Sequence, residues 1–218
     1  MKKTRKALLL GLCALVLVGA SVLGTMAYLT SNDEVVNTFT VGNVGITLDE
    51  AKVNRDGTEV VGAPRVKENG YQLMPGHLYK KDPTIHVGAN SEDCYLFVKV
   101  DNAISALEST VAGESVAAQM ATHGWVAVDQ AKYPGVYVLT EDGAPKFVGK
   151  NTNHVVFDNF TISKDVIGFG GYEKNEDGTL KAKITVTAYA IQKDGFDGWT
   201  GLKIWEDGLG MKKATATN

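Results

Sequence analysis

Asp-Gly pairs set between short apolar runs are the feature that most narrows what this chain can fold into. The pairs begin at Asp56, Asp142, Asp177, Asp194, Asp197 and Asp207. Type I′ turns need a positive φ, which Asp and Gly tolerate, so such pairs typically join antiparallel strands. Leu180–Ile191 gives the clearest strand signal, because Ile184, Val186 and Ala188 alternate with Thr185 and Thr187. These patterns predict an all-β fold, an antiparallel jelly-roll-like β-sandwich.

Alternation and short apolar runs bounded by turn residues predict further strands along the chain. The predicted strand segments are Val35–Leu48, Leu78–Val87, Cys94–Val100, Trp125–Val128, Gly135–Thr140, Pro145–Val148 and His154–Ile162. Gly42 and Gly45 should bend the first segment, and Pro83 should place the second at a sheet edge or at a bulge. The mostly apolar run of the third segment predicts a central strand.

Residues 102–124 interrupt the strand pattern and form a predicted helical insertion. This segment is rich in alanine and lacks alternation, while Val116 and Met120 fall at helical spacing. We expect one helix around Glu114–Thr122, ended by Gly124. Three late apolar positions also repeat at helical spacing: Trp199, Leu202 and Trp205.

The N-terminus has the pattern of a secretory signal peptide, predicted to span residues 1–27. Four basic residues precede an uncharged, mostly apolar run from Ala7 to Ala27, with small side chains at Thr25 and Ala27. This pattern favours cleavage between Ala27 and Tyr28, which leaves residues 28–218 as a secreted β-sandwich domain. The membrane is then involved only through the signal segment. The alternative is a retained anchor, because uncharged sequence continues to Asn32 and is long enough to span a bilayer.

Composition limits the partners and the cross-links of the secreted domain. From Tyr28 onward the chain has 18 basic and 25 acidic residues, a formal charge of −7. An acidic chain is a poor binder of nucleic acid, so we predict no nucleic-acid partner. Cys94 is the one cysteine after Tyr28, which excludes an intramolecular disulfide. We expect Cys94 to act as a small hydrophobic residue in or beside a strand.

The region around the predicted cleavage site resembles a known class of secreted proteins. Gly24–Thr30 runs into Asn37–Val44, and this junction is similar to that of Gram-positive proteins cut by a SipW-type signal peptidase. That group includes TasA, a biofilm fibre protein, and the camelysins. Further landmarks of the resemblance are Met74-Pro75-Gly76, Lys81-Asp82-Pro83 and Ala188–Gln192.

The resemblance implies a jelly-roll-like protein held at the cell surface or in the extracellular matrix. TasA-like members form fibres when an N-terminal segment of one subunit joins the sheet of the next. The corresponding donor segment here is Tyr28–Phe39, whose apolar residues are Tyr28, Leu29, Val35, Val36 and Phe39. An open sheet edge offers unpaired N–H and C=O groups that such a segment satisfies. The alternative is that this stretch is a flexible leader without a partner. The predicted partners are a SipW-type peptidase and further copies of the chain.

The histidines give no recognisable catalytic signature. His77, His86, His123 and His154 are never three or four positions apart, and no His-Glu-x-x-His occurs. We predict no catalytic residue, no cofactor and no metal, and therefore not an enzyme. Because the resemblance includes the camelysins, a surface metallopeptidase using His77 and His86 is an alternative. A surface adhesin that binds glycan or host protein through exposed aromatic side chains is another. The leading expectation is a secreted structural protein of the cell surface or biofilm matrix.

Overall fold

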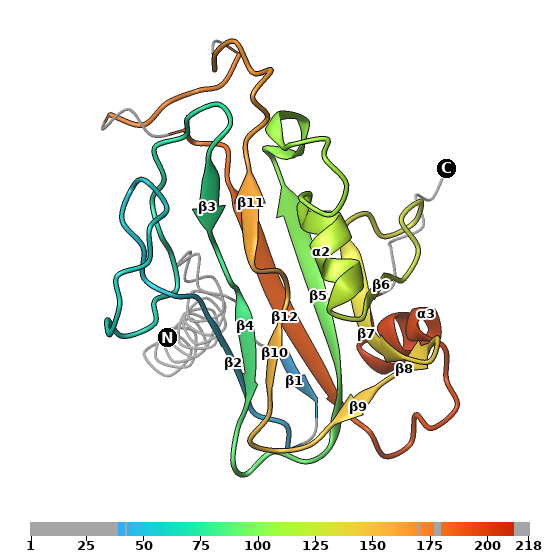
Figure 1. Ribbon diagram of the computed structural model, residues 1–218. Coiled ribbons are helices and arrows are strands. Elements are labelled where there is room, and N and C mark those ends of the chain that lie inside the picture. Colours follow the sequence, from blue (N-terminus) through green and yellow to red (C-terminus); the bar gives the residue numbers. More distant parts are fainter. Residues whose placement is uncertain (1–38, 42, 170, 177–179, 212–218) are drawn as a thin grey trace, which may run out of the picture. The chain divides into compact units, whose positions relative to one another are not determined.

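The computed structural model describes residues 39–41, 43–169, 171–176 and 180–211, which form mostly antiparallel β structure (Figure 1). The strands are β1 (Phe39–Val41), β2 (Ile46–Asp49), β3 (Leu78–Lys80), β4 (Thr84–Val87), β5 (Cys94–Asn102), β6 (Trp125–Ala127), β7 (Val136–Glu141), β8 (Ala144–Pro145), β9 (Phe147–Val148), β10 (Asn153–Val155), β11 (Asn159–Thr161) and β12 (Ile184–Gln192). The helical elements are η1 (Ser105–Leu107), α2 (Val116–Thr122), α3 (Gly201–Lys203) and the π-helical turn η2 (Ile204–Gly208).

A seven-stranded sheet is built around the two longest strands, β5 and β12. They pair antiparallel along their whole length, from Ile184 opposite Asn102 to Gln192 opposite Cys94. On its other side β5 pairs with β7 and β9, while β7 also pairs with β6 and β8. The prediction of a central strand beginning at Cys94 is confirmed. β1 lies on the free side of β12 and is the one described strand that runs parallel to its neighbour.

Two smaller sheets, β10-β4-β2 and β11-β3, are parts of one interrupted ladder. Asn153 of β10 pairs with His86 of β4, and Asn159 of β11 pairs with Lys80 of β3. Both partners are six residues apart between the two pairs, so the antiparallel register is the same on either side of the break. Across the break the Val156 N–H still donates to the Pro83 carbonyl at 2.8 Å. The predicted single strand Leu78–Val87 is therefore wrong as a continuous element. Pro83 has no N–H to donate to the ladder, and the strand breaks beside it.

The main core lies between one face of the large sheet and the smaller sheets. Alternate side chains of β5 and β12 pack there with buried side chains of β2 and β4. Those of the large sheet are Leu96, Val98, Val100, Ile184, Val186, Ala188 and Ala190. Those of the smaller sheet are Ile46, Leu48, Ile85 and Val87. The alternation predicted for β12 is confirmed from Ile184 to Ala190, because the intervening residues there are only half-buried, whereas Ile191 is fully buried on the other face.

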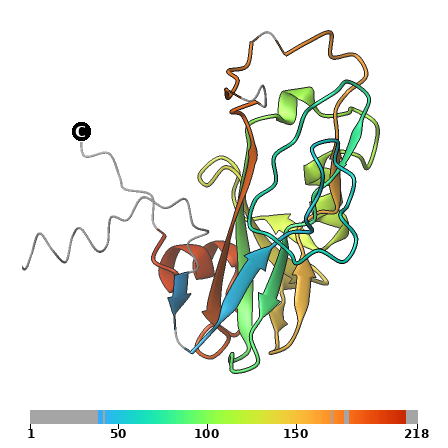
Figure 2. The same cartoon turned by 90° about the vertical axis from the view of Figure 1, so that its left-hand side faces the viewer.

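The opposite face of the large sheet is covered by the C-terminal helical segment, here residues 199–211. Its buried anchors are Ile204 and Trp205, which pack against Phe97 of β5 and Ile191 of β12. Figure 2 shows α3 and η2 on one side of β12 and β2 and β4 on the other. Of the three residues predicted at helical spacing, Leu202 lies in α3 and Trp205 in η2, while Trp199 precedes the N-cap residue Thr200.

The predicted insertion contains the expected helix. Ser115 caps α2 by accepting a hydrogen bond from the Ala118 N–H, and Gly124 follows with φ of +83°. Val116 and Met120 are buried in the main core. The buried Gln119 side chain accepts from the N–H groups of Asn159 and the residue before it, and so ties α2 to β11.

The Asp-Gly turns fulfil the hairpin prediction only in part. Asp142 and Gly143 have φ of +51° and +82° and connect β7 to β8, as a type I′ turn requires. Asp207-Gly208 belongs to η2, so the turn prediction is wrong there. Asp177-Gly178 lies outside the described residues.

Candidate functional site

The described residues contain only the last position of the predicted donor segment. The cleavage positions Ala27 and Tyr28, and the donor positions Leu29, Val35 and Val36, lie outside them. Phe39 is the first residue of β1 and pairs with Tyr189 of β12. The end of the predicted donor therefore lies on a sheet edge within its own chain.

This edge of the large sheet is only partly filled. β1 covers β12 from Tyr189 to Ile191. Within the described ranges, no strand pairs with Ile184–Ala188 on the side away from β5. In the described ranges, the backbone groups of Ile184–Ala188 on that side therefore form a sheet edge, with N–H and C=O groups that pair with no strand there.

The two faces of β12 at and beside this edge have different environments. Ala188 and Ala190 face the main core and are fully buried. Tyr189 lies on the opposite face, where its ring centroid is 5.1 Å from that of Trp205. One face of β12 thus packs in the main core, and its other face packs against the C-terminal helical segment.

The C-terminal helical segment is fixed beside this edge by a buried aromatic group. The Trp205 ring also lies 5.7 Å from the ring of Phe97 and 6.2 Å from that of Tyr133. Glu206 accepts hydrogen bonds from Lys132 Nζ and from Tyr133 Oη, the latter at 2.9 Å. Among the described residues, the buried Trp205 Nε1 has no hydrogen-bond partner.

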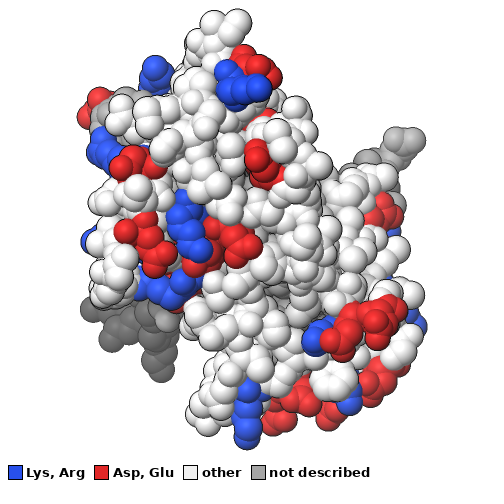
Figure 3. Space-filling view, viewed as in Figure 1, with Lys and Arg blue, Asp and Glu red and all other residues white. Residues whose placement is uncertain are grey.

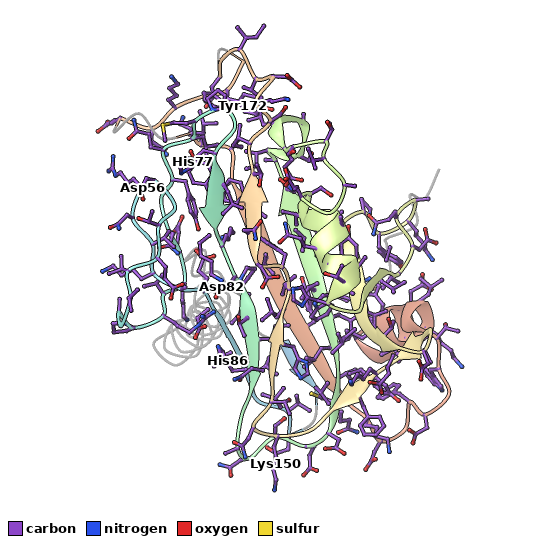
Figure 4. All side chains as sticks on the ribbon, viewed as in Figure 1. Asp56, His77, Asp82, His86, Lys150 and Tyr172 are labelled. Carbon is purple, nitrogen blue, oxygen red and sulfur yellow. The ribbon has the colours of Figure 1, made fainter. Side chains whose placement is uncertain are left out.

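The histidines considered for zinc do not converge. His77 Nε2 lies 2.7 Å from the Asp56 carbonyl oxygen, and His86 Nε2 lies 2.8 Å from Asp49 Oδ1. Figure 4 shows His77 and His86 well apart, at the start of β3 and on β4. Within the part of the chain that the structure describes, no three His, Cys, Asp or Glu side chains are grouped to hold a metal.

Comparisons with family models, curated proteins and solved structures found no match. Among the described residues, no helix is both long and apolar enough to cross a membrane.

Cys94 and most of the large aromatic side chains serve packing. Cys94 is fully buried in β5, and burial raises the pKa of its thiol to about 12, so its role as a small hydrophobic residue is confirmed. Trp125 is buried and donates from Nε1 to the Val155 carbonyl at 2.9 Å. Lys203 Nζ lies 3.9 Å from the ring centroid of the half-buried Trp199.

Sequence reasoning missed a polar network that fixes the irregular segment 51–77 to the smaller sheet. Arg65 is its centre and donates to the side chains of Asp49, Asp82 and Thr84, and to two backbone carbonyls. Figure 3 shows acidic and basic side chains side by side in this region, around the junction of β3 and β4. Arg and Asp in a segment without periodicity give no pattern that could have predicted this pairing.

A second part of the network lies around Glu50, which directly follows β2. Its backbone N–H and C=O both bond to Val66 at 2.8 Å. Its carboxylate accepts hydrogen bonds from Lys81 Nζ at 2.5 Å and from Asn69 Nδ2 at 2.8 Å. In the sequence, Lys81 stands out only as part of the Lys81-Asp82-Pro83 landmark. Glu50 and Asn69 belong to no recognisable sequence pattern.

Proposed function

We propose that this chain is a secreted structural protein of the cell surface or extracellular matrix whose subunits associate by strand addition. The observation that supports this most is β1, which lies parallel to the end of β12 and, among the described residues, leaves Ile184–Ala188 without a strand on that side. An incoming strand there forms main-chain hydrogen bonds along an edge that the described residues leave open. The packing of two layers of strands around one core is consistent with the jelly-roll-like sandwich that we propose for the fold.

The register of β1 suggests which residues would serve as the donor. Phe39 pairs with Tyr189, so a parallel segment that keeps this register has its preceding residues opposite Ile184–Ala188. In the sequence these are Glu34–Thr38, within the predicted donor segment Tyr28–Phe39. Supplied by a second copy, this segment would extend the large sheet between subunits. A signal peptidase of the SipW type, cutting before Tyr28, would release it.

The test is polymerisation of the secreted protein and of a variant that lacks residues 28–37. The matched control replaces the same residues with a Gly-Ser segment of equal length, which keeps the chain length but removes the donor side chains. Electron microscopy should show fibres only for the unaltered chain. Unchanged polymerisation of either variant would remove the donor model. N-terminal sequencing of secreted protein should begin at Tyr28, and a longer N-terminus would contradict the proposed cleavage.

The metallopeptidase alternative predicts a different outcome. Casein cleavage that requires zinc and is lost on His77→Ala or His86→Ala would replace the structural role with an enzymatic one.

A further inference from the structure

An amine, a carboxylate and a carboxamide meet in the polar network beside the smaller sheet. Glu50 is 3 % exposed, and its two carboxylate oxygens accept from different side chains. Lys81 Nζ donates to Oε2 at 2.5 Å, while Asn69 Nδ2 donates to Oε1 at 2.8 Å. The three residues come from separate segments: the position directly after β2, the irregular segment 51–77 and the break between β3 and β4.

The site excludes most water. The side chain of Lys81 is only 12 % exposed, and that of Glu50 is 4 % exposed. Tyr71 lies beside the pair: burial raises its phenol pKa, and the charge of Glu50 raises it further. Lys81 Nζ and Glu50 Oε2 are in direct hydrogen-bond contact, so a proton can pass between them without an intervening water. The transfer leaves a neutral amine, which is the nucleophilic form of lysine.

The carboxamide of Asn69 is held in one orientation. Its Oδ1 accepts a hydrogen bond from the Val53 N–H at 3.0 Å, and its Nδ2 also donates to the Ala51 carbonyl at 2.8 Å. Both backbone partners fix which atom is oxygen and which is nitrogen. The Val53 N–H points at the oxygen that becomes negatively charged when a nucleophile adds to the carbonyl carbon. It therefore acts as an oxyanion donor.

We propose that Lys81 and Asn69 join through an intramolecular amide bond, with Glu50 as the catalytic acid and base. Glu50 takes a proton from the Lys81 ammonium, and the neutral Nζ adds to Cγ of Asn69. The protonated carboxyl group then gives its proton to the departing nitrogen, and the carboxylate takes the second proton from Nζ, which keeps the one hydrogen of an amide. The Nζ–Cγ bond forms, the Cγ–Nδ2 bond breaks and one ammonia leaves, so no oxidant or other reactant is needed.

The bond would tie the irregular segment 51–77 to the sheet at the Pro83 break. It would close a ring from Asn69 to Lys81 in a domain whose described cysteine, Cys94, is free and buried. This inference stands apart from the proposed strand addition, because none of its three residues belongs to β12 or to the donor segment.

Tryptic digestion of the purified full chain tests the proposal directly. Trypsin cuts after Lys67, Lys80 and Lys99 but not at a lysine whose amine is part of an amide. Peptides 68–80 and 81–99 should therefore remain joined, and their combined mass should be lower by one ammonia. Tandem mass spectrometry should locate the junction at Lys81 and Asn69. Separate peptides from protein that circular dichroism shows to be folded would overturn the proposal, as would ammonia loss located elsewhere.

Variants separate the three roles. Lys81→Arg and Glu50→Gln should each leave the peptides unlinked, while Lys80→Arg, at the adjacent position, should leave the link intact. Asn69→Asp should still form the link, with loss of water in place of ammonia. A link that persists in Glu50→Gln would refute the catalytic role of Glu50. The wild-type digest tests the bond itself even if a variant fails to fold.

Discussion

Gly135, just before β7, provides a sharp test of how β5 and β7 are joined. Its φ is +78°, and its carbonyl oxygen accepts a hydrogen bond from the Val100 N–H at 2.8 Å. A Cβ atom added at Gly135 would lie 2.5 Å from the Val100 carbonyl oxygen. That oxygen belongs to the backbone of the central strand and cannot rotate away.

Gly135→Ala should therefore be destabilising for two reasons. The left-handed conformation costs an alanine about 1–2 kcal/mol. Relief of the backbone contact costs about 1–3 kcal/mol more, as overpacking of a well-packed site does. The free energy of unfolding should thus fall by about 2–5 kcal/mol, measured by urea titration.

Gly113→Ala is the matched control. Gly113 has a similar φ of +85°, but an added Cβ would meet no atom within 4 Å. This variant should lose only the conformational part, about 1–2 kcal/mol. Equal losses in the two variants would refute the close approach of Gly135 to β5.

Three further predictions concern buried or charged groups. Trp205→Ala should lower the free energy of unfolding by about 3–5 kcal/mol. Trp205→Phe should cost clearly less, because it also removes a buried N–H that has no partner among the described residues; equal urea midpoints would contradict this. Burial raises the pKa of Glu108, so its contribution to stability is greatest below its ordinary value of 4.5 and falls as the pH rises through the higher folded value. The free energy of unfolding of the unaltered chain, minus that of Glu108→Gln, should therefore decrease as the pH rises above 4.5. Urea titrations that give the same difference at every pH would contradict the raised pKa of Glu108. At Asp49, burial opposes ionisation, but hydrogen bonds from Arg65 and His86 outweigh it and lower the pKa, so this contribution is lost as the pH falls below 3.8. Arg65→Met should move the Asp49 titration upward in carboxyl NMR spectra, and an unchanged titration would count against the network.

Periodicity in the sequence predicted which faces are buried but not which strands meet. β5 was predictable because a continuous apolar run indicates a strand that is buried on both faces. β12 was predictable because alternation of apolar and polar residues indicates a strand that is buried on one face. The segment Val35–Leu48 was predicted as one bent strand. In the structure β1 joins the large sheet and β2 joins a smaller one. Alternating apolar residues give the same sequence pattern in either sheet. The local sequence therefore does not show that β1 and β2 pair with strands of different sheets.

The polar network could not be predicted for a related reason. Glu50, Asn69 and Lys81 are far apart in sequence, and the segment between the first two has no periodic pattern. Their meeting depends on the path of residues 51–77 and on the break at Pro83. The helix at Val116–Thr122, by contrast, was predictable because its apolar spacing and the glycine that follows it are local signals.

The parallel pairing of β1 with β12 determines how the domain would respond to tension. β1 is the first strand and β12 the last strand of the described residues, and both run in the same direction. A pull applied to the two ends would therefore slide these strands past each other along their length. Their hydrogen bonds would bear the load together instead of opening one at a time, and rupture under force is governed by the rate of unfolding rather than by equilibrium stability. The three-residue pairing of β1 with β12 contributes little to the equilibrium stability of the sheet, but it would resist a force applied along these two strands.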